Sequence, residues 1–128
     1  MEQITRYFSP LGRALLALIF VMSGVSKLGA YAGTQGYMEA FGVPGILLPL
    51  VILVEIGAGA ALLLGWQTRL VAFALAGFSV VAGFLFHGDF ADQMQMIMFM
   101  KNVSIAGGLL FIVANGAGHI ALDNRQRN

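Results

Sequence analysis

The sequence predicts an all-α polytopic membrane protein, an antiparallel four-transmembrane-helix bundle with a short interfacial helix in the first outer loop. Hydrophobic residues make up 59% of the 128 residues, and the mean hydropathy is +0.84. Charged residues make up only 10%, against about 25% in soluble domains. A chain this short cannot hide so much apolar surface in a core that faces water. We therefore expect the lipid bilayer to be its surroundings.

Four apolar stretches have the length of a membrane span, which is about 20 helical residues. Polar turns such as "GWQTR" and "HGDFAD" separate them. We predict a single domain over residues 1–128, with spans at about 11–29, 44–64, 69–87 and 93–115. The first span is expected to be a retained helix, because the segment "MSGVSKLG" is a poor signal-peptide cleavage site.

The longest connection, "AYAGTQGYMEAFGV", predicts a short helix that lies at the membrane interface. Thr34 is placed to cap its first turn, and Gly42 is placed to end it. Tyr37 and Phe41 are four residues apart, so a helix brings them to the same face.

Lysine and arginine counts predict the orientation of the bundle. One side of the predicted topology holds five arginines: Arg6, Arg13, Arg69, Arg125 and Arg127. The opposite side holds only Lys27 and Lys101. Both termini are therefore predicted to be cytoplasmic. The net charge of +1 indicates no nucleic-acid partner.

The composition also limits the redox chemistry of the chain. It has no cysteine, which excludes disulfides, iron–sulfur clusters and a thiol relay. The methionines of "DQMQMIMFMKN" suggest Cu(I), because thioethers suit that ion. Alternate helical positions are rotated by about 200°, however, so no face collects three of them. We predict no metal site, and we interpret Met94 and Met98 as packing or as the lining of a flat ligand.

Ionisable residues inside the spans are the candidate functional groups, because each costs about 2.5–3.5 kcal/mol at membrane depth. Glu55 lies about 16 Å along the second span, and Lys101 about 12 Å along the fourth. Lys27 and His87 end the first and third spans on the same side. The four helices therefore direct a polar group each toward one half of the bundle, which predicts a shared pocket.

Each of these residues also has a purely structural interpretation. Lys27 can extend to the headgroups, and His87 can be a solvated helix end. Glu55 can form an internal ion pair with Lys27 or with Lys101, and the sequence leaves that choice open. Asn102 can form a hydrogen bond between helices and do nothing else.

Five segments together resemble the DoxX family of small bacterial membrane proteins, from about Gly12 to Asp123. They are "GRALLALIFVMSGVSKL", "YMEAFGVP", "VEIGAGAALLLGWQTR", "FHGDF" and "MIMFMKNVSIAGGLL". The resemblance implies a multi-pass protein of the bacterial inner (plasma) membrane. It also implies a quinone-linked role, because the family is described as subunits of quinol oxidases and thiosulfate:quinone oxidoreductases. The positions that it indicates are Lys27, Glu55, His87, Lys101 and Asn102.

The leading hypothesis is a quinone-interacting subunit of a membrane oxidoreductase, with no built-in cofactor and with the quinone supplying the redox chemistry. Glu55, Lys101 and His87 are the candidate catalytic groups. The candidate quinone-binding residues are Lys27, Lys101, Asn102, Met94, Met98 and Phe99. An oxidoreductase partner subunit and a homo-oligomer are both compatible with this hypothesis.

Two alternatives belong to other functional classes. A structural or assembly subunit would use the charges only as internal pairs. A small proton-coupled transporter would use Glu55 as its proton carrier and would resemble the small multidrug resistance antiporters. Lys27 and Lys101 would repel a cationic drug, which argues against that second alternative.

Overall fold

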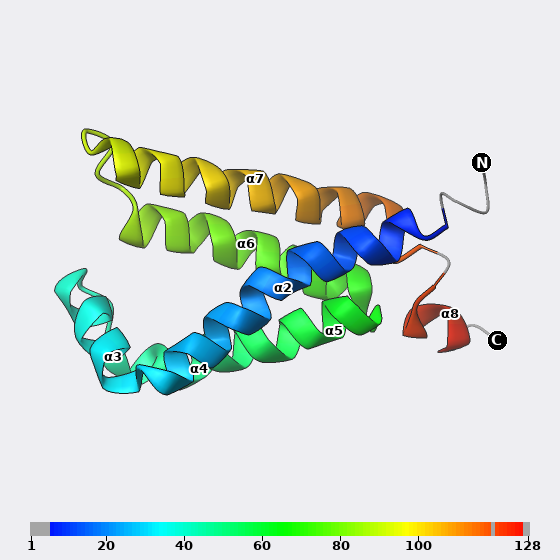
Figure 1. Cartoon of the computed structure of the whole chain (residues 1–128), viewed down its shortest axis with the longest axis horizontal. Coiled ribbons are helices and arrows are strands. Elements are labelled where there is room, and N and C mark those ends of the chain that lie inside the picture. The colour runs from blue at the N-terminus through cyan, green and yellow to red at the C-terminus, as the bar shows by residue number, and fades with distance from the viewer. Residues whose placement is uncertain (1–5, 119, 127–128) are drawn as a thin grey trace.

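The computed structural model describes residues 6–118 and 120–126. The described residues form helices and no strands, as predicted. With the labels of Figure 1, the helices are α2 (Phe8–Gly29), α3 (Tyr31–Ala40), η1 (Gly45–Leu47), α4 (Leu48–Leu53), η2 (Val54–Ala58), α5 (Gly59–Leu64), α6 (Thr68–Phe86), α7 (Gln93–Asn115) and α8 (Leu122–Gln126).

The described helices form four spans that are long and apolar enough to cross a membrane, which confirms the predicted fold class. Three of them are α2, α6 and α7, with 22, 19 and 23 residues. The other is a composite span of 20 residues, Gly45–Leu64, built from η1, α4, η2 and α5. The first span begins three residues before its predicted start, at Phe8.

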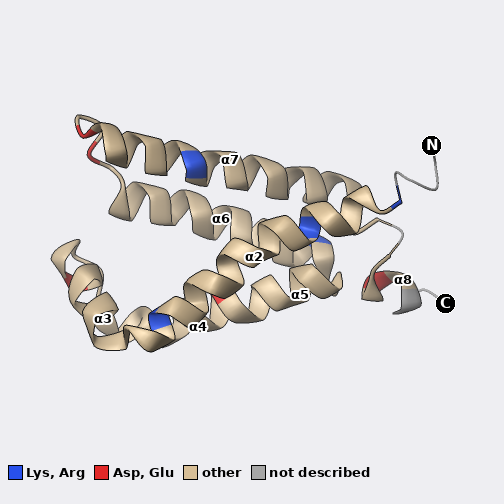
Figure 2. Ribbon diagram, viewed as in Figure 1, with Lys and Arg blue, Asp and Glu red and all other residues tan. Residues whose placement is uncertain are grey.

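The helices form two arms that diverge toward one end of the molecule (Figure 1). In one arm α2 packs along α4, η2 and α5, and in the other α6 packs along α7. We call the end with α3 and the α6–α7 loop the α3 end, and the opposite end the α8 end. Figure 2 shows how few charged residues the long helices carry.

The main core holds the arms together nearer the α8 end. Leu62, Leu75 and Leu109 are its largest fully buried side chains, and small residues such as Ala17 and Ala72 let the helices approach. A smaller cluster of Met38, Leu48 and Ile52 joins α3 to α4. Neither cluster fills the space between the two arms toward the α3 end.

The short helix α3 differs from its prediction at one boundary. It begins at Tyr31 rather than after Thr34, and the Thr34 hydroxyl donates to the carbonyl of Ala30 at 2.8 Å. Thr34 is thus inside the helix and does not cap it, because the preceding residues are already helical. Gly42 ends the helix as predicted, with φ of 80°. The rings of Tyr37 and Phe41 lie 4.9 Å apart, which confirms their shared face.

Candidate functional site

A cavity of about 550 Å³ lies between the two arms, on the α3 side of the core. Its lining is mainly apolar and comes from α2, α3, α4, η2, α6 and α7. The polar residues in that lining are Ser23, Lys27, Thr34, Tyr37, Glu55, Ser79, His87 and Asn102. This combination of apolar walls with a few polar groups is typical of small-molecule sites.

An ion pair between Lys27 and Glu55 is the main charged feature of the cavity. The Lys27 Nζ lies 2.9 Å from Oε1 of Glu55. The carboxylate is almost fully buried, whereas the lysine side chain is 27% exposed. Of the two partners that the sequence allows for Glu55, the structure selects Lys27.

The geometry of this pair leaves the carboxylate with unused acceptor capacity. The Lys27 Nζ donates to Oγ of Ser23 at 2.5 Å. Its contact with Glu55 is close but is not aligned as a hydrogen bond, and Oε1 of Glu55 has no aligned donor among the described residues. A carboxylate accepts several hydrogen bonds, so Glu55 can accept one from a bound molecule or a water.

A π-helical turn carries Glu55. The turn η2 interrupts the second span from Val54 to Ala58, between the α-helical segments α4 and α5. Single π-helical turns inside α-helices are rare and occur often at functional sites. Here the turn places the buried carboxylate at the middle of the composite span, where a charge is most costly.

Two glycines bring α2 close to this turn. A Cβ atom added at Gly24 would lie 2.5 Å from Cγ1 of Ile56, and one added at Gly59 would lie 3.2 Å from Cβ of Phe20. Any larger residue would push the helices apart. The glycines therefore determine the separation at which Lys27 meets Glu55.

The second arm contributes Ser79, His87 and Asn102. Asn102 of α7 donates through Nδ2 to the carbonyl of Ser79 on α6, at 3.1 Å. This is the interhelical hydrogen bond that the structural interpretation of Asn102 expects. His87 follows the last residue of α6 and is partly exposed at the α3 end of the cavity. Its imidazole ring is therefore accessible both to a ligand and to water.

Four of the candidate residues share this cavity and four lie outside it. Lys27, Glu55, His87 and Asn102 line it. The residues outside its lining are Lys101, Met94, Met98 and Phe99. They all belong to α7, as does Asn102, so the sequence pattern alone did not determine which side chains of this helix face the cavity.

The four outside residues have other surroundings. Lys101 is exposed on α7 and makes no ion pair with any residue that the structure describes. Met94 and Met98 are 66% and 37% exposed. Phe99 packs edge-on against Phe84 and Phe90, at 4.9 and 5.0 Å between ring centroids. Phe99 therefore stabilises the α6–α7 hairpin.

Sequence reasoning missed the structural role of Arg13, which it used only as a marker of orientation. Arg13 is 2% exposed, and it donates to the carbonyls of Leu62, Leu63 and Ile120. Its position four residues before Ala17, on the buried face of α2, is the signal that could have revealed this. The role is structural, because Arg13 forms hydrogen bonds with carbonyls at the end of α5 and with the C-terminal segment.

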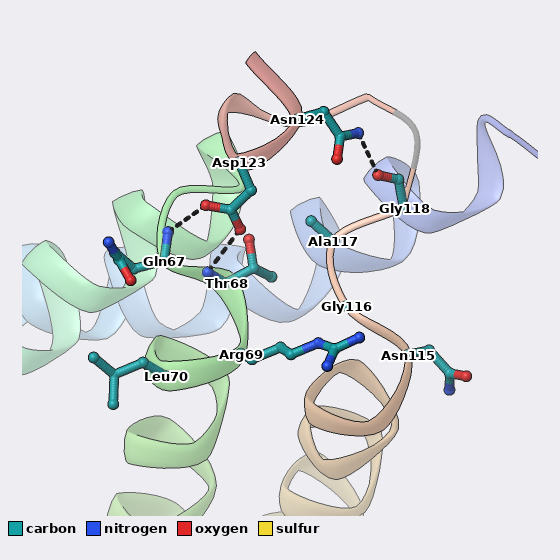
Figure 3. A pocket seen from close by; sticks show the side chains of 10 residues that line it. All are labelled: Gln67, Thr68, Arg69, Leu70, Asn115, Gly116, Ala117, Gly118, Asp123 and Asn124. Carbon is teal, nitrogen blue, oxygen red and sulfur yellow. Dashed lines mark hydrogen bonds between the residues drawn. The ribbon is translucent and has the colours of Figure 1, made fainter. Parts of the chain in front are cut away.

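A second, wider depression of about 830 Å³ lies at the α8 end (Figure 3). Asp123 accepts there from the backbone N–H groups of Gln67 and Thr68, at 2.7 and 2.9 Å. Asn124 donates to the carbonyl of Gly118 at 2.7 Å. These contacts cap α6 and secure the chain end, so we assign this depression to the fold rather than to chemistry.

Comparisons with known proteins agree with this architecture. The DoxX family model matches residues 9–88, from α2 to the end of α6. The inner membrane protein YqjF of Escherichia coli (strain K12) is 49% identical over 111 residues, which cover 87% of this chain and 85% of the relative. The inner membrane protein YphA of the same strain is 35% identical over 123 residues, which cover 90% and 87%. No solved structure matches the chain.

The location follows from the same findings. Both relatives are named as inner membrane proteins, and the chain has four helices that can cross a membrane. The protein is therefore a multi-pass protein of the bacterial inner membrane. The family match covers more than half of the chain and agrees with the identity to both relatives; the chain belongs to the DoxX family.

Proposed function

We propose that this protein binds a quinone in the cavity between its arms, as a quinone-interacting subunit of a membrane oxidoreductase. The observation that carries the proposal is the Lys27–Glu55 pair, which places a buried carboxylate and a partly buried ammonium group in a mainly apolar cavity. A quinone ring is flat, uncharged and apolar on its faces, with two oxygens that need hydrogen-bond donors. The cavity volume is within the range of about 300–1,000 Å³ that small-molecule sites occupy.

The residues present fit such a ring. Lys27 and His87 can donate to ring oxygens, and Asn102 can do so if its bond to Ser79 is exchanged. Phe20, Phe78 and other apolar side chains supply walls for the ring faces. When bound, the quinone would supply the electron-accepting chemistry that this cysteine-free chain lacks.

In this proposal Glu55 holds or moves a proton. Its carboxylate has an acceptor atom without an aligned partner, and it lies 2.9 Å from the Lys27 ammonium group. A proton taken up near Glu55 can pass along the Lys27–Ser23 side of the cavity, where Lys27 is partly exposed. This arrangement couples a buried site to water without an open channel.

Native mass spectrometry in mild detergent, with ubiquinone added in excess, tests the proposal. We expect a bound quinone in the wild type, at least a tenfold lower occupancy in the Lys27→Gln variant, and wild-type occupancy in the Lys101→Ala variant. Lys101 is the matched control, because it is a lysine of the same half of the bundle but lies outside the cavity. Circular dichroism confirms that each variant is folded. Wild-type protein that takes up no quinone would refute the proposal.

A structural or assembly subunit is the second candidate, and Lys101 is the observation that favours it. In α7 only Ala106 and Leu109 are buried, and the helix carries an exposed lysine about 12 Å from its start. A partner helix with a carboxylate at this depth would satisfy that charge. Blue-native electrophoresis of membranes tests this: Lys101→Ala should release the chain from a larger assembly, and unchanged migration would count against the assembly role.

A further inference from the structure

The cavity is not equally closed on all sides. On the flank between α4 and α6, its lining includes residues whose side chains are also exposed on the outer surface of the bundle. Leu50 of α4 is 57% exposed, and Val81 and Leu85 of α6 are 56% and 45% exposed. On the flank between α2 and α7, Ile19 is the comparable residue, with 51%. The α4–α6 flank is therefore the more open one.

The packing of the helices explains this opening. In the described part of the chain, α6 packs against α7, α5 and the turn η2, but it has no comparable packing with α4. The arms diverge on this side of η2 (Figure 1). Because the flanking residues are aliphatic and lie within membrane-spanning helices, the opening faces acyl chains rather than water.

The α3 end of the cavity is covered by a group of aromatic rings. Tyr37 of α3 stacks on Phe86 of α6, with ring centroids 5.6 Å apart and an interplanar angle of 23°. Phe41 meets the edge of Phe86 at 5.5 Å. These rings join α3 to α6 across the end of the cavity. The residues Leu50, Val81 and Leu85 on the α4–α6 flank are aliphatic and form no such group.

We propose that the ligand of this cavity is an uncharged amphiphile that arrives from the bilayer through the α4–α6 opening. Its polar head lies at the Lys27–Glu55 pair and its apolar tail lies between α4 and α6. An uncharged head is favoured because the two charges of the pair cancel, so a charged head would bring an uncompensated charge into a mainly apolar cavity. This inference rests on the proposed function and adds the route, the orientation and the need for a tail.

The first test asks whether lipid reaches the cavity, and it needs no quinone. The sequence has one tryptophan, Trp66, so the Trp66→Phe background accepts a new fluorophore. The Phe78→Trp variant reports from the cavity lining, and the Phe73→Trp variant from the outer face of α6, where Phe73 is 63% exposed. We expect vesicle lipids brominated on their acyl chains to quench the tryptophan fluorescence of both variants, and aqueous iodide to quench the fluorescence of neither.

Quenching of the Phe78→Trp variant by iodide and not by brominated lipid would overturn the lateral opening. A Val51→Trp variant gives the same information from the α4 side of the cavity if the first variant does not fold. Val51 is partly buried and lines the cavity, so the same expected result applies.

The second test closes the opening. The chain has no cysteine, so a Leu50→Cys/Val81→Cys variant can be bridged specifically with a flexible bis-maleimide. A Leu64→Cys/Leu70→Cys variant, bridged in the same way, is the control, because both residues are exposed but lie near the α8 end. The probes are a benzoquinone with a decyl tail and the same ring without the tail, and their binding rates are measured in nanodiscs.

We expect the first bridge to slow binding of the tailed quinone at least tenfold, and the control bridge to change it less than twofold. We also expect the tail-less ring to bind at least tenfold more weakly than the tailed quinone to unbridged protein. Equal rates with and without the first bridge would overturn the lateral route while leaving quinone binding intact. Protein that binds neither quinone but is quenched by brominated lipid would refute the quinone role and leave the opening supported.

Discussion

Loss of either partner of the Lys27–Glu55 pair should destabilise the fold, and loss of both should not. At 2.9 Å and an effective dielectric constant of about 20, the attraction is about 6 kcal/mol. Part of this is lost to screening, because the Lys27 side chain is 27% exposed. Removing one partner of a buried pair typically costs about 3–5 kcal/mol, since it leaves the other charge uncompensated.

The two single variants should differ in a predictable order. Lys27→Met leaves a buried carboxylate without its counter-charge, and we expect it to lower the free energy of unfolding by about 3 kcal/mol. Glu55→Gln leaves a lysine that can turn toward water, so we expect a loss of about 1–2 kcal/mol. The double variant has no charge left and should lie within about 1 kcal/mol of the wild type.

Equilibrium unfolding in mixtures of mild detergent and sodium dodecyl sulfate, followed by circular dichroism, measures these differences. Lys101→Met is the control and should change stability by less than about 0.5 kcal/mol, because Lys101 is exposed and unpaired among the described residues. A double variant whose loss equals the sum of the two single losses would refute the coupling of Lys27 with Glu55.

Three further variants test the contacts around the site with the same unfolding assay. Gly24→Ala should cost about 1–3 kcal/mol, because the added methyl group would lie 2.5 Å from an isoleucine of η2, whereas Gly77→Ala has nothing within 4 Å and should cost nothing. Arg13→Met should cost about 1.5–3 kcal/mol and speed amide hydrogen exchange in residues 120–124, because it removes the donors that hold this segment. Asp123→Ala should cost about 1 kcal/mol and expose the amides of Gln67 and Thr68 to exchange. Unchanged exchange in either variant would contradict the role given to that side chain.

The sequence predicts the spans well because hydropathy and length are properties of a segment by itself. It also places Glu55 and Lys27 in the same half of the bundle, where they form an ion pair, since position along a helix follows from counting residues. The direction of a side chain depends on how the neighbouring helices pack, and the sequence leaves that packing open. Lys101 shows the difference: α7 packs mainly on α6, so most of its circumference is free and Lys101 lies on that free part.

The π-helical turn and the role of Arg13 were missed from the sequence for different reasons. One extra residue in a turn hardly changes an almost uniformly apolar pattern, so Val54–Ala58 reads as ordinary α-helix. Arg13 looked like a flanking charge because its carbonyl partners belong to segments far along the chain. Its burial depends on how the α8 end closes, which is a tertiary property.

The contacts of Arg13 have a consequence for the order in which the protein is made. Leu62 and Leu63 are synthesised about 50 residues after it, and Ile120 follows 107 residues after it. During translation α2 is therefore made before the residues whose carbonyls accept from its Arg13 guanidinium group. The contacts that hold Arg13 in its final position are complete only once Ile120 has been synthesised, so this part of the bundle closes from a later segment back onto an earlier one.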